Sequence, residues 1–230
     1  MGLICHGIIL IAFIIQPSFI DDEKISNLIL GLTLIPLIRI ISLIMPLIQL
    51  PQILWYPIIY IPLLVAAIVV IRTLNIRLKD IGITKKDLPF QIPFGIFLGI
   101  MIGILEYAIL QTEPMVVHFS VSEVLLPAII LLLTTGLVEE FIFRGILQTL
   151  AIPAMGPISG IIYISLIFAV LHVGFHSVTD IAFVFGISLV FAYMVQATKS
   201  IIGVILAHGI ANIVLFLVAP FLLTPGFQLP

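Results

Sequence analysis

Charged residues are scarce in this chain of 230 residues: only 9% are Asp, Glu, Lys or Arg. A soluble globular domain carries roughly 25% charged residues. In their place, 62% of the residues are hydrophobic, and the mean hydropathy is +1.39. One soluble core of this size could not bury so much apolar surface, so the composition predicts an integral membrane protein. The net charge of −2 argues against a nucleic-acid partner.

Cysteine and the common hydrolase signatures are equally sparse. The single cysteine, Cys5, excludes an internal disulfide and has no evident base beside it. The chain contains neither a GxSxG nucleophile elbow nor an HExxH zincin motif. These absences argue against a serine hydrolase of the nucleophile-elbow type and against a zincin metalloprotease.

Long apolar runs make up most of the chain. About 20 apolar residues cross a bilayer as a helix, and eight runs are candidates. Short polar or Pro/Gly-rich stretches separate most of them, which favours antiparallel neighbours in one bundle. We therefore predict an all-α, multi-pass protein of the cell membrane, with about eight transmembrane helices. The predicted spans cover residues 2–20, 27–46, 52–72, 91–111, 123–150, 156–174, 178–197 and 200–222.

One long polar linker orients the chain. Five of the nine Lys and Arg residues lie between positions 72 and 86, and positively charged loops stay in the cytosol. This rule places the linker inside and, with eight spans, both termini outside. Lys24 and Lys199 then also fall inside, which agrees with the rule.

Six polar residues lie deep inside three of the predicted spans. An ionisable side chain at the bilayer centre costs roughly 2.5–3.5 kcal/mol on insertion scales, and such residues usually face the bundle interior and mark function. At ~1.5 Å per residue, Glu139, His172 and His208 lie about 16, 22 and 12 Å from the inner ends of their helices. We therefore predict that the polar residues converge on one intramembrane cavity. The set is Glu139, Glu140, Arg144, His172, His208 and Asn212.

Each member of this set also has a purely structural explanation. Glu140 and Arg144 are four residues apart on one helix and can form a buried ion pair. An intramembrane histidine is often a hydrogen-bonded packing residue, and Asn212 can join two helices. Two further charges are interpreted as lying outside the set. Arg39 snorkels or sits where proline breaks its helix, and Glu106 is interfacial.

Gly95, Gly99 and Gly103 recur every four residues in the predicted span 91–111. They fall on one face of the helix, and small residues let two membrane helices approach closely. We predict a tight contact with another helix along this face.

A wet cavity lined by the six residues has the parts of a peptide hydrolase that uses no covalent nucleophile. A carboxylate and a histidine can activate a water molecule. A second histidine and an amide N–H can stabilise the oxyanion. His172, His208 and a glutamate could also hold Zn²⁺, although nothing in the sequence demands a metal.

Three short motifs carry a family resemblance. EEFIFR (139–144), FAVLH (168–172) and HGIAN (208–212) resemble the EExxxR, FxxxH and HxxxN motifs of the CAAX-protease and bacteriocin-processing family, abbreviated CPBP or ABI. The segment LKDIGITKKDL (78–88) resembles the linker before that family's core. The resemblance implies N-terminal transmembrane helices in residues 1–76 and a catalytic core in residues 77–230, within a single membrane domain.

The resemblance also implies a role for each residue of the set. Glu139 is the catalytic carboxylate that activates water together with His172, and Glu140 and Arg144 support it. The histidine and asparagine of HGIAN bind the oxyanion. The best-known members remove a C-terminal tripeptide from prenylated CaaX proteins through a cavity open to the cytosol. Both glutamate-dependent and zinc-dependent mechanisms are discussed for the family, and we favour the former.

Three functional hypotheses follow. The leading one is an intramembrane endopeptidase, embedded in the lipid bilayer, that cleaves a membrane-associated peptide or a lipidated protein tail. The alternative is a non-catalytic membrane scaffold or bacteriocin self-immunity protein of the same fold. The third is a proton-coupled transporter that uses the Glu/His chain as a relay, but the sequence lacks the repeated broken helices that transporters usually show.

Overall fold

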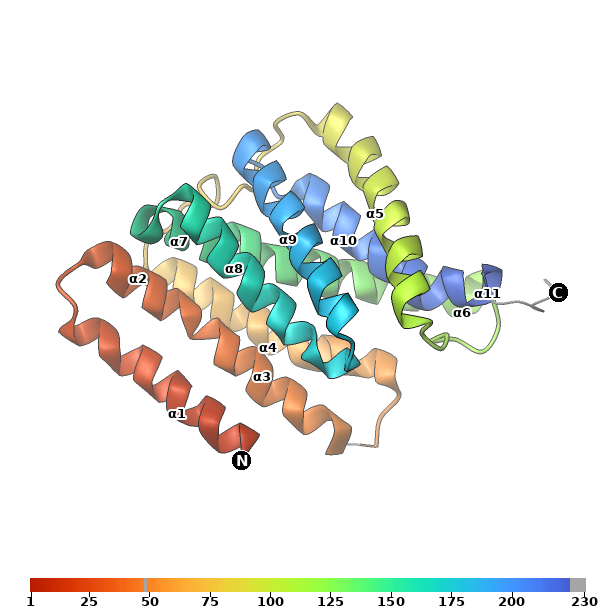
Figure 1. Ribbon diagram of the computed structural model, residues 1–230, viewed down its shortest axis with the longest axis horizontal. Helices are drawn as coiled ribbons and strands as arrows, with labels where there is room; N and C mark the ends of the chain where they lie inside the picture. The colour runs from red at the N-terminus through yellow and green to blue at the C-terminus, as the bar shows by residue number, and fades with distance from the viewer. Residues whose placement is uncertain (48, 224–230) are drawn as a thin grey trace.

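The computed structural model describes residues 1–47 and 49–223, and every regular element in this part of the chain is helical (Figure 1). Residues 224–230, which end the predicted core segment 77–230, lie outside the described part of the chain. Eight helical segments are long and apolar enough to cross a membrane, and they match the eight predicted spans within a few residues. The all-α, multi-pass architecture is thus confirmed. The segments are Gly2–Phe19, Glu23–Ile44, Gln52–Thr73, Leu88–Leu110, Val121–Met155, Pro157–Phe175, Val178–Thr198 and Ile202–Leu222.

Several of these segments consist of more than one helical element. The α-helices are α1 (Gly2–Ile15), α2 (Glu23–Leu32), α3 (Leu34–Ile44), α4 (Gln52–Thr73), α5 (Leu88–Leu110), α6 (Val121–Leu131), α7 (Gln148–Met155), α8 (Pro157–Leu171), α9 (Val178–Thr198), α10 (Ile202–Ile213) and α11 (Ala219–Leu222). The short 3₁₀ turns are η1 (Gln16–Phe19), η2 (Met45–Leu47) and η5 (His172–Phe175), and the π-helical stretches are η3 (Leu132–Glu139), η4 (Phe141–Leu147) and η6 (Val214–Val218).

The spans alternate in direction, so their connections gather at two ends of the bundle. We call the end with residues 20–22, 74–87, 156 and 199–201 the linker end. The opposite end holds the N-terminus, the turn between α3 and α4, residues 111–120 and residues 176–177, and we call it the termini end.

The polar linker itself is folded against the bundle. Ile81 is buried, and the Gly82 carbonyl accepts a hydrogen bond from the Ile201 N–H at 3.0 Å. Arg77 donates to both carboxylate oxygens of Asp80, at 2.7 and 3.1 Å. These hydrogen bonds hold the pKa of the Asp80 carboxyl below its usual value, because they favour the ionised form. The linker is therefore an ordered, charged cover on one end of the molecule.

The glycine face of α5 packs directly against α10. A Cβ atom added at Gly95, Gly99 or Gly103 would lie 2.5–2.6 Å from a carbonyl oxygen of α10, closer than any real Cβ contact. The two helices therefore touch backbone to backbone along three turns, and the predicted tight contact is confirmed. This contact fixes the height of α10 relative to α5.

The span Val121–Met155 departs from the regular helix that its sequence predicts. It passes from α6 into the π-helical stretches η3 and η4 before it ends as α7. Thr134 and Thr135 each donate a hydroxyl hydrogen bond to the carbonyl four residues earlier, at 2.6 and 2.7 Å. Such back-bonding competes with the helix ladder and often bends helices. Wider π turns are frequent at functional sites, and this one carries the EExxxR motif.

Candidate active site

A cavity of about 220 Å³ lies inside the bundle, between α3, α4, the η3–η4 region, α8 and α10. Four of the six predicted residues line it: Glu139, His172, His208 and Asn212. Most of the other lining side chains are apolar or aromatic. Three helices that are distant in sequence thus bring a carboxylate, two imidazoles and a carboxamide to one space.

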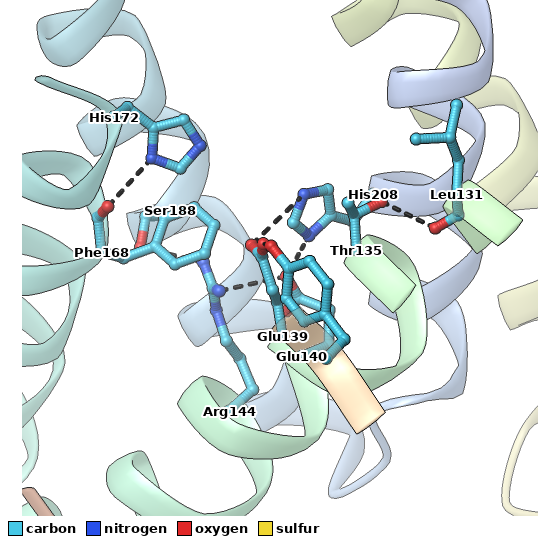
Figure 2. Close-up of polar contacts among 10 residues, drawn as sticks. Leu131, Thr135, Glu139, Glu140, Arg144, Phe168, His172, Ser188 and His208 are labelled. Atoms are coloured by element: carbon cyan, nitrogen blue, oxygen red, sulfur yellow. Dashed lines mark hydrogen bonds and ion pairs between the residues drawn. The ribbon is translucent and has the colours of Figure 1, made fainter. Parts of the chain in front are cut away.

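Glu140 and Arg144 do not line this cavity and instead form a buried network beside it. Arg144 Nη1 donates to Glu140 Oε1 at 3.0 Å, and Nη2 donates to Ser188 Oγ on α9 at 2.9 Å (Figure 2). The side chains of the ion pair are only 0% and 1% exposed. The guanidinium also lies over the Phe168 ring, 4.3 Å from its centroid. The ion pair expected from the i, i+4 spacing is present.

His208 connects the two glutamates (Figure 2). Its Nδ1 lies 2.7 Å from Glu140 Oε1, and its Nε2 lies 3.8 Å from Glu139 Oε2. Because an ionised carboxylate only accepts, Nδ1 carries the hydrogen of the shorter contact. Glu139 also accepts a hydrogen bond at Oε1 from the hydroxyl of Tyr60 on α4. The carboxylate of Glu139 is therefore held from two sides.

The ring of His172 has a defined tautomer. Its Nδ1 lies 3.0 Å from the carbonyl oxygen of Phe168, one turn earlier (Figure 2). A carbonyl can only accept, so Nδ1 carries the hydrogen and Nε2 of the neutral ring keeps a free lone pair. The FxxxH spacing thus supplies both the histidine and the backbone group that orients it.

Two glycines bring HGIAN next to EExxxR. A Cβ on Gly136 would lie 2.7 Å from the Ile205 carbonyl oxygen and 2.9 Å from the Gly209 Cα. Gly209 follows His208 directly, and Gly136 lies one turn before Glu139 and Glu140. Close approach of η3 and α10 at this point is what allows the short contacts between His208 and the glutamates.

Comparison with known proteins agrees with these motifs. Residues 120–214 match a family model described as type II CAAX prenyl endopeptidase Rce1-like. The matched segment, 95 of the 230 residues, is similar to the CPBP family that the three motifs resemble. All six residues of the predicted set lie in the matched segment. Searches among curated proteins and among solved structures gave no match.

The similarity to this family model indicates the broad class of the protein. The matched model describes CAAX prenyl endopeptidases, so the family implies an intramembrane protease of the CAAX type. Together with the eight apolar helices, the match makes the chain an integral multi-pass membrane protein.

The sequence left open a Zn²⁺ site formed by His172, His208 and a glutamate. The arrangement of these side chains in the structure does not fit such a site. Within residues 1–47 and 49–223, no three His, Cys, Asp or Glu side chains lie close enough to hold one ion. His208 Nδ1 is bonded to Glu140, and His172 Nδ1 is bonded to a backbone carbonyl. No step of the mechanism proposed below passes through a metal.

The interpretation of Glu106 as lying apart from the polar set is wrong. Its side chain is buried, and it lines a second, smaller cavity of about 30 Å³ that His172 and His208 also line. His172, His208 and Asn212 line both cavities. Glu106 follows Gly103 by three residues, so it continues the α5 face that packs on α10. The sequence contained the information needed to predict this position, because the glycines already marked the face of the helix that packs against another helix.

The interpretation of Arg39 as lying outside the site is also wrong. Arg39 is half-buried on α3 and lines the main cavity together with Glu139. Tyr60, the hydrogen-bond donor to Glu139, was not predicted at all. A tyrosine in an apolar span gives no periodic or motif signal, so only the packing of α4 against η3 shows its role.

The main cavity extends toward the termini end of the bundle. Its lining includes Ser42 near the end of α3, Tyr56 near the start of α4, and Gly174 and Phe175 at the end of the α8 span. Its lining residue nearest the linker end of α10 is His208, in the second turn of that helix. The lining of the cavity therefore lies nearer to the termini end than to the basic linker.

Proposed function

We propose that the chain is an intramembrane endopeptidase that hydrolyses a peptide bond of a membrane-associated peptide or lipidated, CaaX-type protein tail. The observation that carries this proposal is the shared cavity of Glu139, His172, His208 and Asn212. A carboxylate and a histidine with a free Nε2 lone pair flank one space, and polar N–H donors lie across it. These are the groups that a water-activating hydrolase needs.

The proposed reaction begins with a water molecule between Glu139 and His172. His172 Nε2 accepts one hydrogen bond from the water and orients it, and Glu139 takes a proton as the water oxygen attacks the peptide carbonyl carbon. The oxyanion then accepts hydrogen bonds from the Asn212 amide and from His208 when its Nε2 is protonated. As the C–N bond breaks, the proton on Glu139 passes to the leaving amine.

The surrounding groups keep this arrangement in place. Tyr60 holds one oxygen of Glu139, and Glu140 holds the ring of His208. Arg144 in turn holds Glu140. We further propose that residues 1–76 and 77–230 act as one membrane domain, since α3 and α4 supply part of the wall around the core residues.

The proposal is tested by replacing the base. Purified Glu139→Gln is expected to lose cleavage of prenylated CaaX peptides or of a bacteriocin precursor, because an amide cannot accept the proton from water. The fold is expected to persist, since the replacement keeps the shape of the side chain. Glu113→Gln, in an exposed loop at the termini end, is the matched control and keeps wild-type turnover.

Metal analysis of the same preparations accompanies the assay, and turnover is expected to survive dialysis against a chelator. Equal turnover in Glu139→Gln and wild type would reject the assigned base. Absence of cleavage in both proteins, with partner binding retained in both, would favour the scaffold or immunity alternative.

A further inference from the structure

We propose that Arg39 forms a binding subsite for the terminal carboxylate of the peptide substrate. This inference rests on the proposed peptidase function and names what the cavity recognises. Arg39 lies on α3, outside the segment that matches the family model, and lines the same cavity as Glu139. One cavity thus holds both a hydrolytic carboxylate and a cation.

The guanidinium of Arg39 has no partner among the described residues. No ion pair or side-chain hydrogen bond joins it to residues 1–47 or 49–223, and only its backbone carbonyl accepts a bond, from Ser42 Oγ. Arg144, the other arginine far from a span end, is by contrast bound by Glu140, Ser188 and an aromatic ring. An unpaired cation inside a span is costly, so a partner from outside the chain is expected.

The cavity selects the chemistry of that partner. An arginine fork matches a carboxylate through two parallel hydrogen bonds. A linear peptide with an unmodified C-terminus carries a carboxylate there, whereas acidic side chains are rare in segments that enter a bilayer. The walls around Arg39 include Ile38 and Ile59, which favour an otherwise apolar segment. The best fit is therefore a short apolar peptide that ends in a free carboxylate.

The size of the cavity points the same way. Its volume of about 220 Å³ is below the ~300–1,000 Å³ of ordinary ligand pockets. A space of this size holds a short terminal piece of peptide rather than a long chain that passes through. Arg39 would then set how far from the C-terminus the scissile bond lies, since it anchors the end while Glu139 acts on an earlier bond.

The experiment compares two fluorescent peptides that are identical except for their C-terminus, which is a carboxylate in one and an amide in the other. Both are titrated onto Glu139→Gln, which binds without cleaving. We expect the carboxylate form to bind about 10- to 100-fold more tightly, as a charge-assisted hydrogen bond implies. In Glu139→Gln/Arg39→Gln the two peptides are expected to bind equally, while Arg39→Lys keeps part of the preference. Arg72→Gln, which removes an exposed cation at the linker end, is the control and keeps the preference in full.

Turnover measurements on otherwise wild-type protein separate binding from chemistry. Arg39→Gln is expected to raise KM for the carboxylate peptide by a similar factor while kcat changes little, because Arg39 does not touch the scissile bond. For the amidated peptide neither constant changes. A structural role for Arg39 would instead affect both peptides alike.

Equal binding of the two peptides to Glu139→Gln, or a carboxylate preference that survives Arg39→Gln, overturns the inference. The inference is also overturned if the two peptides bind equally and inorganic phosphate displaces both. That result would assign Arg39 to a phosphate or lipid headgroup. The binding arm needs no turnover. If the protein cleaves peptides but does not prefer the carboxylate form, the Arg39 subsite is rejected and the peptidase proposal stands. If it prefers the carboxylate form but cleaves nothing, the peptidase proposal is rejected and Arg39 remains an anion-binding site.

Discussion

At the scale of single residues, the buried Glu140–Arg144 pair has two possible functions that mutagenesis can separate. Removing one partner of a buried ion pair leaves an uncompensated charge and costs about 3–5 kcal/mol. Arg144→Met is therefore expected to lower the thermal unfolding temperature of the protein in detergent by many degrees. Replacing both partners with apolar residues is often close to neutral, so Glu140→Leu/Arg144→Met is expected to recover most of that stability.

Activity in the double variant decides between the two explanations. Glu140 holds His208 Nδ1 at 2.7 Å, and this contact is lost in Glu140→Leu/Arg144→Met. We expect turnover to stay far below wild type although the fold is restored. Recovery of both stability and turnover would show that the pair is structural only, the simpler explanation that its i, i+4 spacing allowed.

The sequence predicted the six motif residues because their cost in a membrane makes them conspicuous. Counting residues along each helix gave their depth, but depth alone does not say which way a side chain points. For this reason Arg39 and Glu106 were placed outside the site, although both line cavities beside the histidines. The bond from Tyr60 to Glu139 depends on how α4 packs, and no local pattern encodes it.

At the scale of helical elements, the crossing of η3 and α10 holds the site together. A methyl group on Gly136 would lie 2.7 Å from the Ile205 carbonyl oxygen, so Gly136→Ala must push the two helices apart. Overpacking of this kind costs about 1–3 kcal/mol. Because His208 moves with α10, we expect Gly136→Ala to lower both the unfolding temperature and the turnover number.

Gly186 provides the control, because nothing lies within 4 Å of a Cβ added there. It sits inside α9, where glycine is less favourable than alanine by roughly 0.5–1 kcal/mol. Gly186→Ala is therefore expected to raise the unfolding temperature slightly and to leave turnover unchanged. A harmless Gly136→Ala would mean that His208 does not depend on this crossing.

Apolar run length was sufficient to predict all eight spans, since it reflects the bilayer thickness. The π-helical turns of η3 and η4 were not predictable in this way. They depend on a shift of backbone hydrogen bonds by one residue, to which Thr134, Thr135 and the contact at Gly136 contribute. The span was therefore right in extent and wrong in its internal geometry.

At the scale of the whole molecule, charge is distributed very unevenly between the two ends of the bundle. Seven of the nine Lys and Arg residues lie at or beside the linker end, and the other two are Arg39 and Arg144 within spans. The termini end therefore has none in its connections. The seven are Lys24, Arg72, Arg77, Lys79, Lys85, Lys86 and Lys199.

This asymmetry bears on the side of the membrane from which substrate enters. Positively charged connections stay in the cytosol. This rule predicts that the linker end faces the cytosol and that the cavity, which lies nearer to the termini end, is reached from the outer side. The family resemblance implies the reverse, a cavity open to the cytosol. The two expectations conflict, because the lining of the cavity extends toward the termini end and the basic linker lies at the other end. The charge difference of seven against none leads us to predict a cavity that opens outward. This orientation favours a membrane-associated peptide on the outer leaflet, the first substrate class of the proposed function, over a CaaX-type tail in the cytosol.

Single-cysteine labelling on intact cells tests this orientation. With Cys5 replaced by alanine, Val117→Cys reports on the termini end and Leu78→Cys on the linker end, since both positions are well exposed, at 80% and 57%. A membrane-impermeant maleimide is expected to label Val117→Cys at once and Leu78→Cys only after the cells are permeabilised. The reverse pattern would place the opening of the cavity in the cytosol, where a prenylated protein tail can reach it directly. Substrate added outside intact cells should then remain uncleaved, whereas the outward orientation predicts its cleavage.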